Sequence, residues 1–374
     1  MKSISKYKVD MSIILCIILF AIISIVTIGS AERLLDETAN LVLKQVIWYV
    51  IGFIFIFFIM FLGNHLLFKN TKSLYILGII LLILVLLFGK EINHARCWFQ
   101  IKGINIQPSE FMKIILIITL GKMINTFKIK YNNPTIMEEL KFLIKVLIVV
   151  GIPSILTFLQ PDTGVVLIYL LITIIMLFIS GIRYRWFAIL FGICLGFVGI
   201  VLITYFINND LFINIFGSSF FLRVDRLLDW SSGSGYQLEN GITSIGSGGL
   251  LGYGINNTPI YFPEPQTDFI FAVFANNFGF LGSITLLVLI TFFDLKLIKL
   301  AIESPNNINK YVISGIIGML IYQQLQNIGM TIGIMPITGI TLPFISYGGS
   351  SLLSYMIMLG IILNISNENI RYRN

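Results

Sequence analysis

The sequence predicts an all-α polytopic membrane protein of about ten transmembrane helices, with both termini cytoplasmic and a large extracellular loop between spans 7 and 8. Composition is the first of three observations behind this prediction: of 374 residues, 57% are hydrophobic and 11% are charged, with a mean hydropathy of +0.92. A soluble domain carries roughly 25% charged residues. The second observation is a series of apolar stretches, and the third is the placement of Lys and Arg between them.

The apolar stretches are each near or above the ~17 to 25 residues that a helix needs to cross the hydrocarbon core. In chain order they lie near residues 11–28, 45–63, 73–89, 110–127, 143–159, 163–180, 186–207, 269–294, 311–334 and 345–366. No small-residue cleavage site follows the first stretch, so we expect a membrane span there rather than a signal peptide. We expect residues 1–374 to form a single transmembrane domain.

Positive charge gives the orientation. Lysines and arginines fill the N-terminal tail, the C-terminal tail and alternate loops, whereas the longest loop, about residues 208–268, carries only Arg223 and Arg226. Cytoplasmic loops carry an excess of Lys and Arg, so the termini are expected inside and this loop outside. The net charge of +7 is therefore an orientation signal rather than a nucleic-acid footprint.

Cysteine and histidine are scarce. Cys16 and Cys194 fall inside expected spans and Cys97 stands alone in an outer loop, so no disulfide framework is expected. His65 and His94 are expected on opposite faces of the membrane, which excludes a zinc or haem site built from histidines of this chain. Metal-assisted chemistry would have to use carboxylates.

The glycine-rich run "IGSGGLLGYG", Ile245 to Gly254, matches neither phosphate-binding pattern, because it lacks a terminal G-K-[ST] and has Leu251 in place of the third glycine of G-x-G-x-x-G. We interpret it as backbone forced into tight turns near the membrane surface. Such turns can still line a substrate groove.

Charges at the ends of spans carry more information, since a charge inside the bilayer usually faces a cavity or a partner. Glu110 and Lys113 in "INIQPSEFMK" are three residues apart, on one helix face. One interpretation is a capped helix start, with Ser109 as the N-cap and Glu110 at the positive end of the dipole. The other is a pair that neutralises itself beside a cavity. The residues alone do not decide between these two interpretations.

Three further segments interrupt the apolar pattern. In "LQPDTGVV", Asp162 is expected to cap the following helix at a short outer turn, in preference to direct chemistry. The segment from Asn327 to Leu353 has no charge but many glycines, prolines and hydroxyls, which indicates a cavity wall, since non-helical backbone at membrane depth needs one. In "FPEPQTDFIFAVF", Asp268 stands where a polar loop becomes apolar, and the residues alone favour a helix N-cap.

These segments together resemble the SEDS family (shape, elongation, division and sporulation), which includes RodA, FtsW and SpoVE. The matching pieces are "RCWFQIKGINIQPSEFMK", "QPDTG", "GYQLENGITSIGSGGLLGYG", "PEPQTDFIFAV" and "NIGMTIGIMPITGITLPFISYGGSSLL", in the family's order. The resemblance covers nearly the whole chain.

The resemblance implies an inverting peptidoglycan glycosyltransferase of the bacterial cytoplasmic membrane. Such an enzyme polymerises lipid II, an undecaprenyl-diphosphate-linked disaccharide-pentapeptide, into glycan strands on the outer face, for elongation, division or sporulation. It also implies a partner, a class B penicillin-binding protein that crosslinks the strands. The acid of the family's "TDFIF" motif is the proposed catalytic residue, and here it is Asp268.

Substrate-binding residues are expected among the outer cations and the motif polar groups. Cations can hold the leaving diphosphate through charge-assisted hydrogen bonds, and a partly desolvated carboxylate can serve as base. A divalent cation, Mg or Mn, is a possible cofactor. The candidates, besides catalytic Asp268, are Arg96, Lys102, Lys113, Arg223, Arg226, Gln107, Ser109, Glu110, Ser346 and Tyr347.

The sequence departs from the family pattern twice. Asn276 and Asn277 stand where the family commonly has an acidic pair, and Val165 stands where a hydroxyl residue is usual. Any help from those acids in proton transfer or cation binding would be lost. Two rival functions remain. One is a lipid II flippase, since transporters also have charge pairs and broken helices within the membrane, and it would need polar groups accessible from both faces. The other is an inactive scaffold for the transpeptidase, which the loss of the acidic pair makes less remote.

Overall fold

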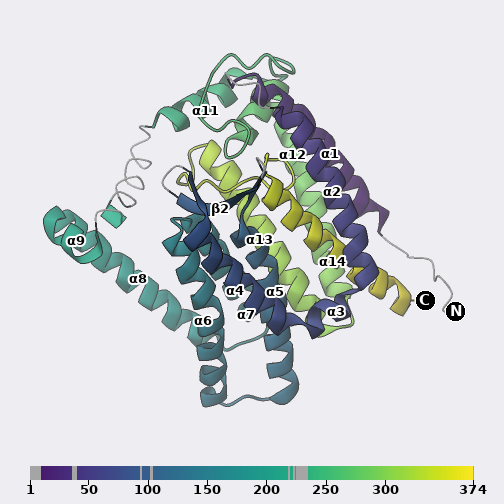
Figure 1. Ribbon diagram of the computed structural model, residues 1–374, viewed down its shortest axis with the longest axis vertical. Helices are drawn as coiled ribbons and strands as arrows, with labels where there is room; N and C mark the ends of the chain where they lie inside the picture. The colour runs from purple at the N-terminus through teal and green to yellow at the C-terminus, as the bar shows by residue number, and fades with distance from the viewer. Residues whose placement is uncertain are drawn as a thin grey trace.

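The computed structural model describes residues 10–35, 40–92, 95–101, 104–217, 220–221, 224 and 235–373. Ten helices of 17 or more residues occur in this part of the chain, one at each expected span (Figure 1). They are α1 (Met11–Glu32), α2 (Leu41–Leu62), α4 (Thr71–Phe88), α5 (Pro108–Lys130), α6 (Ile136–Leu159), α7 (Thr163–Ile179), α8 (Tyr184–Ile207), α12 (Ile270–Glu303), α13 (Asn307–Thr331) and α14 (Gly349–Arg373). The candidate residues Lys102, Arg223 and Arg226 lie outside the described residues.

Seven of these helices are long and apolar enough to cross a membrane: α1, α2, α4, α6, α8, α12 and α14. The apolar helix α7 has 17 residues and is shorter than the others. The remaining two, α5 and α13, are less apolar because they carry polar residues. Helix α5 contains Glu110, Lys113 and Lys122, and α13 contains a cluster of glutamines and Asn327 near its end. The chain is a multi-pass membrane protein, with α5 and α13 largely buried inside the bundle.

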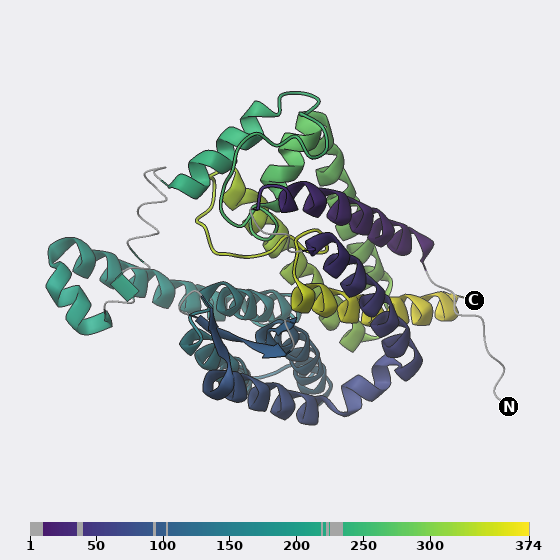
Figure 2. The same cartoon turned by 45° about the horizontal axis from the view of Figure 1, so that its top comes forward.

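The bundle is built around α5, α13 and α14. Helix α13 packs against α5, α7 and α12, while α14 lies along α2 and also contacts α5. Helix α8 departs from this arrangement: it is almost entirely exposed and projects from the bundle with the short helix α9 (Asn209–Phe216) at its far end (Figure 2). Its base is held by Trp186, whose indole N–H donates to the carboxylate of Glu139 on α6 at 2.9 Å.

Three short strands make the all-α prediction wrong in one place. Strands β1 (Lys90–Ile92), β2 (Ala95–Ile101) and β3 (Ile104–Ile106) form an antiparallel sheet in the order β1-β2-β3. The sheet follows α4 and precedes α5, and it contacts α4, α5 and α14. Strands of three and seven residues give too few alternating positions to stand out in a sequence dominated by long apolar runs.

Regular structure also occurs where one long loop is expected. Within residues 208–268 the described part includes α9 and the amphipathic helix α11 (Tyr236–Ser247). A further short helix in the described part of the chain is α3 (Asn64–Lys69), between α2 and α4.

The glycine-rich run forms the tight turns that the sequence predicts. It wraps around a kink in α12 at Gly279, which has φ +64°. A Cβ on Gly252, whose φ is +79°, would lie 2.2 Å from the carbonyl oxygen of Asn277. The amides of Tyr253 and Gly254 donate to the carbonyls of Asn276 and Asn277, both at 3.0 Å. Only glycine permits this close approach of the loop to the helix.

Candidate active site

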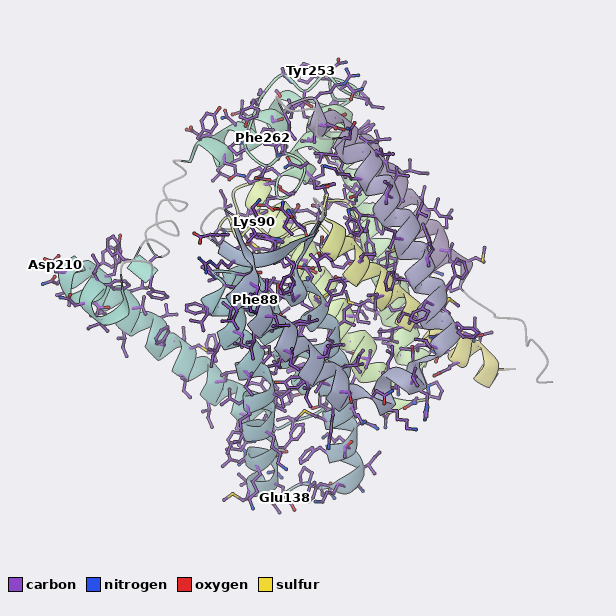
Figure 3. All side chains as sticks on the ribbon, viewed as in Figure 1. Phe88, Lys90, Glu138, Asp210, Tyr253 and Phe262 are labelled. Atoms are coloured by element: carbon purple, nitrogen blue, oxygen red, sulfur yellow. The ribbon has the colours of Figure 1, made fainter. Side chains whose placement is uncertain are left out.

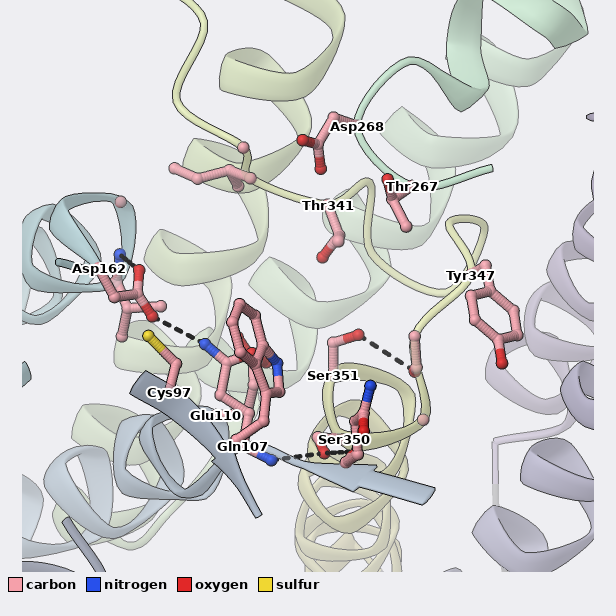
Figure 4. A pocket seen from close by; sticks show the side chains of 18 of the residues that line it. Cys97, Gln107, Glu110, Asp162, Thr267, Asp268, Thr341, Tyr347, Ser350 and Ser351 are labelled. Carbon is pink, nitrogen blue, oxygen red and sulfur yellow. Dashed lines mark hydrogen bonds between the residues drawn. The ribbon is translucent and has the colours of Figure 1, made fainter. Parts of the chain in front are cut away.

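A cavity of about 830 Å³ opens between the strands, α2, the first turns of α5, α7 and α14, and the segments before α12 and α14 (Figure 4). Its polar and aromatic lining side chains are Lys44, Trp48, Cys97, Trp98, Asn105, Gln107, Glu110, Asp162, Glu264, Thr267, Asp268, Gln323, Thr341, Tyr347, Ser350 and Ser351. Residues 339–341 and 347–351 supply one wall, which confirms the prediction for that uncharged, glycine-rich segment. The cavity brings together Asp268, Glu110, Gln107 and Tyr347 of the expected site.

Asp268 does not cap α12. The N-cap position belongs to Phe269, and no side chain makes a capping hydrogen bond there, so the N-cap interpretation of Asp268 is wrong. The carboxylate instead faces the cavity across from Thr341 (Figure 4). Burial, reinforced by the nearby Glu264, raises the pKa of Asp268 from 3.8 to about 7. A carboxyl group with this pKa exchanges protons near neutral pH, as a general base must.

Glu110 and Lys113 form the buried pair that the helical spacing indicates. The Lys113 ammonium lies 2.7 Å from Glu110 Oε2, and the Lys113 side chain has no exposed surface. The same ammonium lies 5.5 Å from the centre of the Tyr355 ring. Glu110 lines the cavity and Lys113 does not, so the lysine neutralises the carboxylate from behind the cavity wall.

Ser109 is not the N-cap of α5. The cap is Gln107, followed by Pro108 at the first helical position, where a missing N–H costs nothing. The Ser109 hydroxyl instead donates to Asp162 at 3.4 Å, behind the cavity lining. The sequence pattern placed the helix start two residues too late because serine is a common cap.

Asp162 caps α7, as predicted, and also lines the cavity. Its Oδ1 accepts from the amide of Val165 at 3.2 Å, and its Oδ2 accepts from the side-chain amide of Gln107 at 2.7 Å. Burial raises the pKa of Asp162 from 3.8 to about 6, although these hydrogen bonds oppose the shift. The hydrogen bond between Gln107 and Asp162 links the two motifs "QPDTG" and "QPSEFMK" on one side of the cavity.

The single lysine or arginine among the described lining residues is Lys44, on α2. The sequence analysis missed it because it falls beside an apolar stretch, with no motif around it. Arg96, an expected diphosphate ligand, is not part of the lining: it pairs with Glu91 at 3.1 Å, and its side chain is 55% exposed.

Ser346 lies behind the lining and holds two of its segments together. Its hydroxyl donates to the carbonyl of Thr267 at 2.6 Å and accepts from the amide of Leu342 at 2.8 Å. Tyr347, next to it, lines the cavity and donates its backbone amide to the carbonyl of Gln266 at 2.8 Å. The segment before α14 is thereby fixed to the segment that carries Asp268.

The two family departures lie in different places. Val165 lines the cavity, so a methyl group there replaces a polar one. Asn276 and Asn277 are fully buried away from it: the side chain of Asn276 donates to the Ser244 carbonyl, and that of Asn277 accepts from the Thr258 hydroxyl at 2.9 Å. The asparagines therefore hold α11 and the loop around Thr258 rather than the cavity.

Four carboxylates line the cavity, those of Glu110, Asp162, Glu264 and Asp268. Within the described residues, no three His, Cys, Asp or Glu side chains gather closely enough to hold a metal ion. A Mg²⁺ ion commonly binds through one or two carboxylates together with substrate phosphates. The carboxylates here fit that shared mode rather than an all-protein metal site.

Comparison with known proteins gives the family. The family model FtsW/RodA/SpoVE, described as "Cell cycle protein", matches residues 8–371. The chain belongs to this family. It is 32% identical to stage V sporulation protein E of Bacillus subtilis, over 96% of this chain and 98% of that protein. It is 30% identical to a probable peptidoglycan glycosyltransferase FtsW of Coxiella burnetii, with 98% of each chain covered.

Solved structures of the FtsW/RodA/SpoVE family share the fold. RodA of Thermus thermophilus, a rod shape determining protein, superposes with a TM-score of 0.69 at 27% identity, covering 96% of this chain and 97% of that one. A chain from a peptidoglycan synthase complex, described as coordinating polymerization and crosslinking, superposes with a TM-score of 0.79 at 26% identity, covering 97% and 99%. The similarity extends over the whole bundle.

Proposed function

We propose that this protein is a peptidoglycan glycosyltransferase that polymerises lipid II at the outer face of the bacterial cytoplasmic membrane. The observation that carries the proposal is the environment of Asp268: a carboxyl group with a pKa of about 7, free of any capping role, in a cavity that also contains a lysine. Relatives named peptidoglycan glycosyltransferase over nearly the full length of the chain support the reaction class.

The proposed orientation has the termini inside and the cavity outside. Glu138 and Tyr253 lie at opposite ends of the molecule, with Lys90 and its strand nearer the Tyr253 end (Figure 3). The connection between α5 and α6 at the Glu138 end is flanked by Lys128, Lys130 and Lys141. By the positive-inside rule that end is cytoplasmic. The cavity then opens near the outer surface, where the sugars of lipid II would lie above its lipid tail.

Asp268 is the general base in this proposal. It takes the proton of the acceptor 4-hydroxyl as that oxygen bonds to the anomeric carbon of the donor sugar. The bond between the anomeric carbon and the diphosphate breaks in the same step, with inversion, and the diphosphate leaves with the bonding electrons. A base with a pKa near 7 is well matched to this transfer at neutral pH.

Lys44 is placed to bind the leaving diphosphate, because it is the cation that the described lining offers. Its ammonium would supply charge-assisted hydrogen bonds to phosphate oxygens. A divalent cation bound between the diphosphate and lining carboxylates would supply further neutralisation. Lys113 contributes indirectly, since it offsets the charge of Glu110 and so lowers the repulsion that a diphosphate would meet.

The proposed partner is a class B penicillin-binding protein that crosslinks the strands. Similarity to a chain of a peptidoglycan synthase complex supports such an assembly. Contacts with the outer segments from residue 208 to 268 and with membrane helices would activate the glycosyltransferase. Co-purification with the class B proteins of the host should recover at least one; full polymerisation by the isolated chain with no associated protein would contradict activation.

One assay separates the enzyme from a lipid II flippase. The purified chain is reconstituted in liposomes with labelled lipid II, with and without the partner, and both glycan product and movement of lipid II between leaflets are measured. The proposal predicts polymer from lipid II supplied at the outer face, and about 100-fold less or lower still from the Asp268→Asn variant. Leaflet exchange without polymer would support the flippase, and neither activity would support the scaffold.

A further inference from the structure

Asn327 ties together two cavity segments that are distant in sequence. It lies on α13, one turn before the helix ends, and its side chain is fully buried. Its side-chain nitrogen donates one hydrogen bond to the carbonyl oxygen of Asp268 and another to that of Ile340, each at 2.8 Å. Asp268 and Ile340 both line the cavity, whereas Asn327 does not.

These two bonds act where the backbone has no regular structure. Asp268 precedes the N-cap of α12, and Ile340 belongs to the irregular segment between α13 and α14. No other described residue donates to either carbonyl. Gly339, beside Ile340, approaches the Asp268 carboxylate so closely that a Cβ there would lie 3.5 Å from Oδ2. Ser346 and Tyr347 fix the neighbouring residues Thr267 and Gln266, and Asn327 adds the direct link between the backbone of Asp268 and the 339–341 wall.

We infer that Asn327 is a positioning residue for the reaction, fixing the Asp268 carboxylate against the 339–341 wall of the cavity. The inference rests on the proposed function, because it acts through Asp268 as the base. A displacement of about 1 Å in a reacting group can cost about 100-fold in rate. The amide suits this task, since its two N–H groups diverge and can reach two carbonyls at once.

Asn276 provides a matched control. It is also a fully buried asparagine whose side-chain nitrogen donates two hydrogen bonds, to the Ser244 carbonyl at 2.8 Å and the Ser247 hydroxyl at 3.1 Å. It does not line the cavity. Leucine at either position removes two buried hydrogen bonds with little change of size, so the two variants should lose comparable thermal stability.

The test compares Asn327→Leu with Asn276→Leu in the lipid II polymerisation assay across pH. We expect Asn327→Leu to lower kcat about 10- to 100-fold with KM nearly unchanged. In the plot of kcat against pH, the apparent pKa of the acidic limb should be lower for Asn327→Leu than for the parent, because a displaced carboxylate gains water. The titratable groups that share the cavity with Asp268 are unaltered in both variants; they are Lys44, Cys97, Glu110, Asp162, Glu264 and Tyr347. Asn276→Leu should keep the parental pKa.

Equal losses of kcat in both variants with the acidic limb unmoved would overturn the inference, and so would a raised KM at parental kcat. If Asn327→Leu does not fold, Asn327→Gln retains both donors on a longer stem and should still lower kcat and shift the limb. The parent and Asp268→Asn are run alongside. Polymerisation by Asp268→Asn at the parental rate would refute Asp268 as the base, and absence of polymer from the parent with its partner would refute the proposed function; both results are distinct from failure of the Asn327 inference.

Discussion

Asp268 should destabilise the folded protein at alkaline pH, and Asp268→Asn should remove that cost. Burial raises the pKa of the folded-state carboxyl from 3.8 to about 7, so the native state binds its proton more tightly than the unfolded state. The resulting stabilisation is complete below pH 3.8 and is lost as pH rises through 7. Each pKa unit corresponds to about 1.4 kcal/mol, which gives a total of about 4 kcal/mol as an upper bound.

The assay is thermal unfolding of both proteins in the same detergent or lipid, from pH 5 to pH 8.5. Of the total pH-dependent change in unfolding free energy that Asp268 causes, about 3 kcal/mol occurs between pH 5 and pH 8.5. Asp268→Asn should melt at a temperature close to the parent's at pH 5 and clearly above it at pH 8.5. A difference that is constant with pH, or one that narrows as pH rises, would show that Asp268 is not held in a desolvated position and would refute the reasoning.

Three further predictions concern residues around the site. Lys113→Met should destabilise the fold by about 3–5 kcal/mol because it leaves Glu110 charged and unpaired, and the double variant with Glu110→Gln should recover much of that loss; additive melting shifts would rule out the pair. Gly252→Ala should lower Tm, since its Cβ would meet the Asn277 carbonyl, whereas Gly192→Ala on exposed α8 should not, and equal effects would contradict the packing. Lys44→Met should raise the KM for lipid II by about tenfold or more; an unchanged KM and kcat would remove Lys44 from the diphosphate site.

The sequence predicted the helices and the local contacts. All ten expected spans have a helix, because long apolar runs have few alternatives to helix in a bilayer. The Glu110–Lys113 pair and the Asp162 cap were also predictable, since each depends on a spacing of three residues along one helix or turn.

Contacts between distant segments were not predictable from one sequence. Lys44 enters the cavity because α2 packs along α14, which no local pattern records. The same holds for Asn327 and Asp268, which are 59 positions apart. The SEDS resemblance identified Asp268 as a candidate, but residue type alone favoured an N-cap, and only the fold separates these interpretations. The expected orientation and extracellular loop remain part of the proposal.

The most direct test of Asp268 as the base is the pH dependence of kcat/KM for lipid II polymerisation by the purified protein with its partner. The account predicts an acidic limb with an apparent pKa near 7, and a loss of about 10²- to 10⁴-fold in rate for Asp268→Asn at pH 7.5 with lipid II binding retained. Near-parental glycan synthesis by Asp268→Asn, with the same acidic limb, would contradict the account.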